Sequence, residues 1–153
     1  MKSKPSDLQD HLGFWLRKLS NHVSASFAQR VEKYGVSVAN WVVLRVLFND
    51  EAMTLTEVVR AVGVDQGALS RMVERLVARG WVSRQESPTN RREVAISLTA
   101  EGRKLVPKLA READENDRMI FGHLPPSEIK GFEATIKRLL AHHHGEPLQI
   151  PMS

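Results

Sequence analysis

The hydrophobic period of this chain changes from helical to strand-like at one place, and that change limits the folds open to it. Before Gly80, apolar residues recur every three or four positions, which indicates helices that pack through one face. Residues 81–98 instead alternate between apolar and polar side chains, which is the period of a half-buried strand. The helical period returns over residues 99–143. We therefore predict a mainly α fold with one small β-hairpin.

Capping residues and glycines predict where the helices begin and end. Helices are expected at residues 7–33, 37–49, 54–62, 65–79, 99–122 and 126–143. Gly35, Gly63 and Gly80 follow three of them, because glycine readily takes the left-handed conformation that ends a helix. Thr54 begins a capping box, in which a hydroxyl and a later glutamate bind free N–H groups. Pro107 lies inside the fifth segment, where it removes one backbone hydrogen bond and is expected to kink the helix.

The composition excludes several classes of function. The chain has no cysteine, so it can form no disulfide, thiol nucleophile or cysteine-ligated zinc site. No apolar run approaches the length of a membrane span, and the N-terminus lacks a secretory signal, so we expect a cytoplasmic protein without membrane contacts. No catalytic set stands out, and the adjacent histidines at 142–144 point in different directions from a helix end. We therefore expect no enzyme activity, no cofactor and no metal.

The distribution of cations is more informative than the net charge of +4, which is modest. Residues 54–98 carry seven positive charges, all of them arginine, whereas all eight lysines lie outside this segment. Arginine binds phosphates and guanine edges through two parallel N–H donors, which lysine cannot do. The bias favours a nucleic-acid partner, and an arginine-rich genome is the alternative explanation.

Two short helices joined by a glycine turn match the helix-turn-helix plan, whose second helix enters the major groove of DNA. The second helix, 65–79, is apolar on one side and polar on the other, with a slender first turn at Gly67 and Ala68. An ordinary amphipathic surface helix would show the same pattern. The DNA contacts expected from the two helices are Thr54, Thr56, Gln66, Gly67, Ser70, Arg71 and Arg75.

The hairpin that follows predicts a wing. Its turn, SPTNRRE, includes Asn90, Arg91 and Arg92, although a tight turn needs only small polar residues. Arginines at a wing tip suit the phosphates and the narrow minor groove of DNA. We expect one arginine to touch DNA while the other braces the turn, and a solvated charged turn is the alternative. A helix-turn-helix followed by such a hairpin is a winged helix.

The stretch DQGALSRMVERLVARGWVSRQESPTNRREVAISLTAEG resembles the recognition helix, the wing and the next helix start of the MarR family. The likeness extends over about residues 8–140 and is strongest in the wing. The family usually has an aspartate where this chain has Asn90, whose amide accepts a hydrogen bond but brings no charge. The resemblance implies a homodimer whose winged modules, residues 37–98 here, read the two halves of a palindromic operator.

The long terminal segments agree with this implication. We expect residues 1–153 to form a single domain. In an isolated chain, the helices at 7–33 and 99–143 would expose large apolar stripes, so we expect them to form the dimer contact. Residues 145–153 are expected to be a loose tail.

The resemblance also implies a small aromatic, anionic ligand that releases the protein from DNA. The matching positions are Trp41 and Arg45, a ring face and a cation one helical turn apart, which suit a flat carboxylate or a phenol. His11 and Trp15, one turn apart on the first helix, are candidates to line the same space. The alternative is that Trp41 packs in the core and Arg45 pairs with a nearby acid.

These features together predict a sequence-specific, double-stranded DNA-binding regulator, a homodimeric repressor that such a ligand releases. Two other readings remain open. One is an architectural DNA-binding protein that responds to no ligand, and the other is a winged helix used only for protein contacts.

Overall fold

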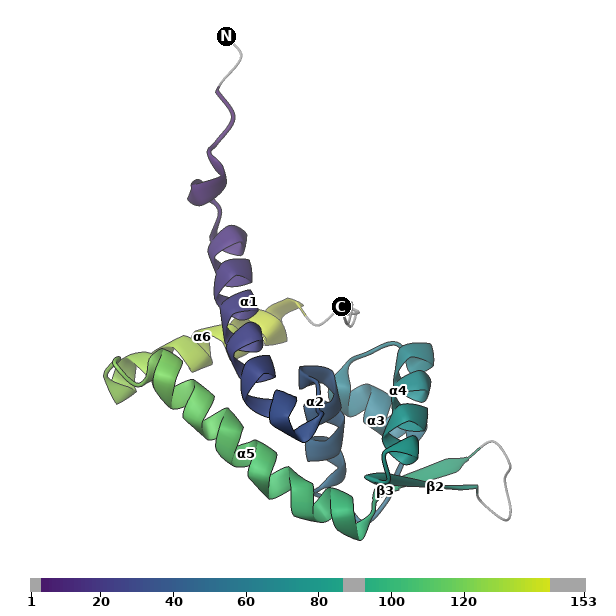
Figure 1. The fold of residues 1–153 in the computed structure, drawn as a ribbon. Helices are drawn as coiled ribbons and strands as arrows, with labels where there is room; N and C mark the ends of the chain where they lie inside the picture. Colours follow the sequence, from purple (N-terminus) through teal and green to yellow (C-terminus); the bar gives the residue numbers. More distant parts are fainter. Residues whose placement is uncertain (1–3, 87–92, 144–153) are drawn as a thin grey trace.

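The protein is described by a computed structural model over residues 4–86 and 93–143. Most of the chain is helical, and a small sheet lies at one end (Figure 1). The elements in chain order are η1 (Leu8–Asp10), α1 (Leu12–Val31), η2 (Glu32–Tyr34), α2 (Val38–Leu47), β1 (Met53–Thr54), α3 (Leu55–Val62), α4 (Gln66–Ala78), β2 (Val82–Glu86), β3 (Val94–Leu98), α5 (Ala100–Phe121) and α6 (Pro126–His143). The predicted fold class, mainly α with a small β wing, is confirmed.

The winged module begins and ends its helices where the local chemistry predicts. The Thr54 side chain accepts a hydrogen bond from the N–H of Glu57, whose carboxylate accepts one from the N–H of Thr54, which completes the capping box at α3. Asp65 accepts a hydrogen bond from the Ala68 N–H and caps α4. Gly63 and Gly80 have φ of 72° and 75°, the left-handed conformation that stops the preceding helices.

The sheet contains a third strand that the sequence did not predict. Its order is β1-β3-β2, and both pairings are antiparallel. Met53 lies opposite Ile96 and Thr54 opposite Ala95, so β1 covers the outer edge of β3. The predicted hairpin is therefore present as β2 and β3, and β1 extends it to a three-stranded sheet. A strand of two residues is too short to show an alternating pattern, and its partner is distant in sequence.

The hydrophobic core joins the winged module to two of the long helices. Buried side chains come from the second half of α1, from α2, α3, α4 and the sheet, and from the first half of α5. Phe27 and Val31 enter this core from α1, and Val106 and Leu109 enter it from α5. By contrast, none of residues 126–142 in α6 is buried. The helix α6, which lies on the side of the molecule away from the wing, is therefore largely exposed to solvent within one chain (Figure 1).

The N-terminal helix is shorter than predicted. Instead of one helix over 7–33, a 3-10 turn precedes α1, and His11 between them is extended with ψ of 120°. The Asp10 carboxylate turns back to accept a hydrogen bond from the Asp7 N–H, which favours a turn over a continuing helix.

The helix α5, in contrast, continues through Pro107 from Ala100 to Phe121. Pro107 is exposed, so the carbonyl it leaves unpaired can face water.

Glu112 of α5 fastens the end of α1 to α5. Its carboxylate lies 2.5 Å from Nζ of Lys33 and 3.5 Å from Nη1 of Arg30, and it accepts a 3.4 Å hydrogen bond from the Tyr34 hydroxyl. The hydrogen bond from Lys33, followed by the charges of Lys33 and Arg30, lowers the pKa of Glu112 against the opposing effect of burial. The bond to Glu112 raises the pKa of Lys33.

We expect Glu112→Gln to lower the melting temperature at neutral pH and to reduce the loss of stability in acid. Because the folded-state pKa of Glu112 is lowered, its contribution is present above the ordinary carboxyl pKa and is lost as the pH falls through the folded value. The melting temperatures of wild type and variant should therefore differ at about pH 7 and converge as the pH falls below the folded-state pKa of Glu112. Thermal unfolding followed by circular dichroism across this range measures both.

Glu101→Gln is the matched control, because Glu101 pairs with Lys104 where both side chains are about 70% exposed. Its melting curves should follow those of the wild type at every pH. If Glu112→Gln and Glu101→Gln behave alike, Glu112 does not hold α1 to α5.

Candidate nucleic-acid interface

The helix α4 divides into a buried face and a free face. Four apolar residues pack into the core and are at most 2% exposed: Leu69, Met72, Val73 and Leu76. On the other side Gln66, Arg71 and Arg75 are exposed, and Ser70 is half-buried between the two faces. This is the division that the sequence predicted. A helix held in this way can offer its polar side chains to a groove without losing core contacts.

Gly67 leaves room at the start of this helix. A Cβ placed there would lie 3.1 Å from Oδ2 of Asp65 and 3.8 Å from Nη1 of Arg71. The Arg71 guanidinium therefore extends back along the helix toward its N-terminus, as side chains on helices generally do. The structure places a cation beside the free N–H groups of the first turn. Both features attract a phosphate or the acceptor edge of a base.

The two threonines at the start of α3, its N-cap Thr54 and Thr56, are in different situations. The Thr54 hydroxyl is engaged within the capping box, where it also donates to a carboxylate oxygen of Glu57 at 3.1 Å. Thr56, in the first turn of the same helix, is exposed. The Thr54 hydroxyl is therefore used in capping, whereas Thr56 is accessible to solvent.

The strands of the wing lie next to one end of α4 and extend away from it (Figure 1). Val82 of β2 is buried, so Arg84, two residues on, lies on the same side of the strand as the core. There its Nη1 approaches Oε1 of Glu74 in α4 at 3.9 Å. On the opposite side of β2 the hydroxyls of Ser83 and Ser97 are 2.9 Å apart and join the two strands. Arg84 was not among the predicted DNA contacts, although the alternation of β2 indicates which side of the strand it occupies.

The tip of the wing lies outside the described residues. Asn90, Arg91 and Arg92 therefore remain sequence predictions, as does the loose tail at 145–153.

The residues predicted to bind a ligand do not come together within one chain. The Trp41 ring is half-buried and meets the edge of Phe27, with ring centroids 6.0 Å apart. The Arg45 side chain is exposed to solvent on α2. It donates a hydrogen bond to Asn49 at 2.6 Å rather than pairing with an acid. The N-terminal end of α1 points away from the winged module (Figure 1).

His11, which precedes α1, and Trp15 of α1 both make local polar contacts. The His11 ring lies 3.0 Å from the Ser6 hydroxyl, and the Trp15 indole N–H donates to the Gln9 carbonyl at 2.9 Å. The expectation that these two residues line the same space as Trp41 and Arg45 is therefore not met within a single chain.

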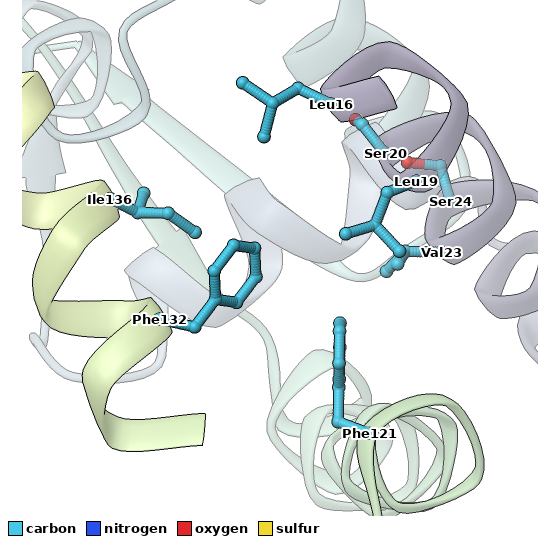
Figure 2. Close-up of a pocket in the computed structure, with 8 residues that line it drawn as sticks. All are labelled: Leu16, Leu19, Ser20, Val23, Ser24, Phe121, Phe132 and Ile136. Atoms are coloured by element: carbon cyan, nitrogen blue, oxygen red, sulfur yellow. The ribbon is translucent and has the colours of Figure 1, made fainter. Parts of the chain in front are cut away.

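A cavity of about 230 Å³ lies elsewhere, between α1, the end of α5 and α6 (Figure 2). Figure 2 shows Phe132 and Ile136 of α6 facing α1, with Phe121 of α5 closing the space. The lining is otherwise Leu16, Leu19, Ser20, Val23 and Ser24, all from α1. None of the four predicted ligand residues takes part, and the lining carries no charge.

Within residues 4–86 and 93–143, no group of three His, Asp or Glu residues is arranged to hold a metal ion. In the same part of the chain, no helix is both long enough and apolar enough to cross a membrane.

Comparison with known proteins identifies the family. The MarR family matches residues 36–94, which cover the predicted module, residues 37–98, except for its last four residues. The regulator PrsX of Escherichia coli is 29% identical over 137 residues, which are 88% of this chain and 82% of PrsX. Among solved structures, BpsR of Bordetella bronchiseptica, whose DNA binding is regulated by 6-hydroxynicotinic acid, aligns with a TM-score of 0.81 and 29% identity. That alignment covers 89% of this chain and 97% of BpsR.

A mutant MarR from Escherichia coli in complex with operator DNA aligns equally well, with a TM-score of 0.81 and 25% identity over 88% of this chain and 99% of that one. The likeness thus includes the terminal helices as well as the winged module. Together with the free face of α4 and the adjacent wing, these matches support a winged helix-turn-helix transcriptional regulator of the MarR type; regulators of the MarR family bind DNA and are not enzymes.

Proposed function

We propose that this regulator is a homodimeric repressor that binds a palindromic operator through α4 and the wing, and that a small aromatic acid releases it. The observation that carries the proposal is the free face of α4. Arg71 and Arg75 are exposed there, and no ion pair within the described residues neutralises either cation. Two unneutralised guanidinium groups on a helix beside a wing are suited to phosphates and to guanine edges.

The sequence-specific contacts are assigned to the first half of α4. Gln66, Ser70 and Arg71 lie on one side of it, where short side chains allow the helix to approach base edges. Thr56 and Arg75 are assigned to phosphates next to the groove. At the wing, Arg91 and Arg92 are proposed to reach the backbone or the minor groove.

Dimerisation is proposed because the terminal helices expose apolar side chains that one chain leaves in water. Leu12 and Trp15 of α1 are 68% and 48% exposed, and Leu139 and Leu140 of α6 are 47% and 54% exposed. An extensive apolar surface of this kind marks an interaction site. A second copy would cover it with the same surface, as a two-fold symmetric interface requires.

The release by an aromatic acid is proposed at Trp41 and Arg45. Arg45 is accessible, and its guanidinium lies 5.8 Å from the Phe48 ring, while Trp41 lies one helical turn before it on α2. The related BpsR, which responds to 6-hydroxynicotinic acid, supports this class of ligand. The separation of His11 and Trp15 from this pair favours the alternative of a ligand-independent DNA-binding protein, so the two readings need a direct test.

For DNA binding, we expect Arg71→Ala to weaken binding to the selected operator by about 1–3 kcal/mol at a fixed salt concentration. The reason is the loss of two parallel hydrogen bonds to a base. Fluorescence anisotropy with a labelled palindrome, selected by the wild-type protein from random double-stranded DNA, measures the change. Arg111→Ala, which removes an exposed arginine from α5, should bind as the wild type does. An unchanged affinity for Arg71→Ala would remove Arg71 from the interface.

For dimerisation, we expect Leu139→Asp to shift the protein from dimer to monomer. A carboxylate buried in an apolar interface without a partner is strongly destabilising. Ala134→Asp introduces the same charge in the same helix, at an exposed position on the other side, and should remain dimeric. Sedimentation velocity at matched concentrations distinguishes the two. If Leu139→Asp sediments as the wild type does, the dimer contact lies elsewhere.

For ligand response, we expect 6-hydroxynicotinic acid or benzoic acid to release the wild type from its operator. Arg45→Gln should need about ten- to a hundredfold more acid, because a hydrogen bond to a charged group contributes about 1.5–3 kcal/mol. Its affinity for DNA without acid should be unchanged. Arg17→Gln, an exposed site on α1, is the control. A wild type that stays on DNA at every acid concentration would support the ligand-independent alternative.

A further inference from the structure

A single hydroxyl group joins the end of α4 to the beginning of α5. The Thr99 side chain donates a hydrogen bond to the Gly80 carbonyl at 2.6 Å, and the same oxygen accepts one from the Gly102 N–H at 3.1 Å. We call these two hydrogen bonds the Thr99 bridge. Gly80 directly follows the cap of α4, and Thr99 is the N-cap of α5, so the bridge connects two helix caps.

The α4 side of the bridge is rigid. After Arg79, the Gly80 N–H bonds to the Val77 carbonyl at 2.9 Å and the Trp81 N–H bonds to the Leu76 carbonyl at 3.1 Å. These are the two hydrogen bonds of a Schellman motif, with Gly80 in the left-handed conformation at φ of 75°. The Gly80 carbonyl is therefore held in a fixed direction relative to the axis of α4.

The α5 side is equally close. The Thr99 N–H donates to the Trp81 carbonyl at 3.1 Å, which extends the pairing of β2 with β3 by one step. A Cβ on Gly102 would collide with that same Trp81 carbonyl oxygen, so only glycine allows α5 to approach this closely. The first turn of α5 is thus held against the backbone that leaves α4.

We infer that Thr99 is a positioning residue, whose hydroxyl sets the angle of the recognition helix α4 relative to the dimerisation helix α5. This inference rests on the proposed function for its consequence in DNA binding. Two half-sites on one duplex have a fixed spacing and rotation, so each α4 must keep its angle to the α5 that carries it. If the junction were looser, the angle between α4 and α5 would vary in the free protein. DNA binding would then have to fix this angle, and the lost conformational freedom would weaken binding.

Three substitutions separate the bridge from ordinary helix capping. Thr99→Ser keeps a hydroxyl that donates and accepts, so it keeps both bonds. Thr99→Asp keeps the cap of α5, because aspartate is a good N-cap, but an ionised carboxylate cannot donate to the Gly80 carbonyl. Thr99→Val keeps the shape and loses both bonds. Thr135→Val, which removes a local 2.9 Å bond to Gly131 in α6, is a control for the loss of a threonine hydroxyl.

The angle itself can be measured without DNA. The chain has no cysteine, so Gln66→Cys in the first turn of α4 and Lys108→Cys in α5 provide unique sites for spin labels. Labelled protein mixed with an excess of unlabelled protein reports the distance within one chain by pulsed electron paramagnetic resonance. We expect Thr99→Asp and Thr99→Val to broaden the distance distribution, and Thr99→Ser and Thr135→Val to leave it narrow.

Any other pattern overturns the inference. If Thr99→Asp stays narrow, capping alone explains the junction, and if Thr99→Ser broadens as much as Thr99→Val, the hydroxyl is not responsible. Should Thr99→Val fail to fold, Thr99→Asp and Thr99→Ser still decide between these outcomes.

The DNA readout uses unlabelled variants with the selected palindrome and with a duplex holding one half-site. Thr99→Asp and Thr99→Val should bind the palindrome at least about fivefold more weakly than the wild type, while Thr99→Ser stays close to it. Affinity for the single half-site should change little in all of them. An equal loss on both duplexes would mean that the α4 surface itself is damaged, which contradicts a positioning role. If the wild type selects no palindrome, the proposed function fails, and the distance measurement still decides the role of Thr99.

Discussion

The structure depends on the burial of one side of α4. Leu69, Met72, Val73 and Leu76 fill the centre of the winged module, and none is more than 2% exposed. Each fully buried side chain of this size contributes about 1.5–3 kcal/mol, so turning the helix about its axis would be very costly. The polar side of α4 is therefore presented to solvent because the core fixes the other side. The wing, whose strand β2 continues from the end of α4, is carried to the same end of the molecule (Figure 1).

Features set by neighbours in sequence were predictable, and features set by distant parts of the chain were not. The caps at Thr54 and Asp65 and the left-handed glycines depend on a few adjacent residues, and all were predicted correctly. The strand β1 exists only because β3, some forty residues later, offers an edge, so nothing local indicates it. The approach of Arg84 to Glu74 depends in the same way on how the hairpin folds back beside α4.

The candidate site shows the same limit. The exposed and buried faces of α4 followed from its period, because the period of a helix determines which residues share a face. The positions of Trp41 and Arg45 on α2 could likewise be predicted from the neighbouring sequence. Their distance from His11 and Trp15 could not be predicted, because it depends on the direction in which α1 leaves the core and on the break at His11. Trp41 and Arg45 share one helix, whereas His11 precedes the helix that carries Trp15, so the two pairs face different surroundings in the folded chain.

The close junction of α4 with α5 restricts how the proposed ligand could release the protein from DNA. The winged module has a single core that includes Val106 and Leu109 of α5, so a ligand cannot turn α4 alone without opening that core. A movement of the whole winged module together with the first half of α5 disturbs the core less. In such a movement α5 would bend or slide where it meets α6 and the N-terminal part of α1. Such a movement alters the spacing of two α4 helices in a dimer and leaves each helix surface intact. In the proposed dimer, the proposed ligand near Arg45 of α2 would then act through the contact of the winged module with the other subunit.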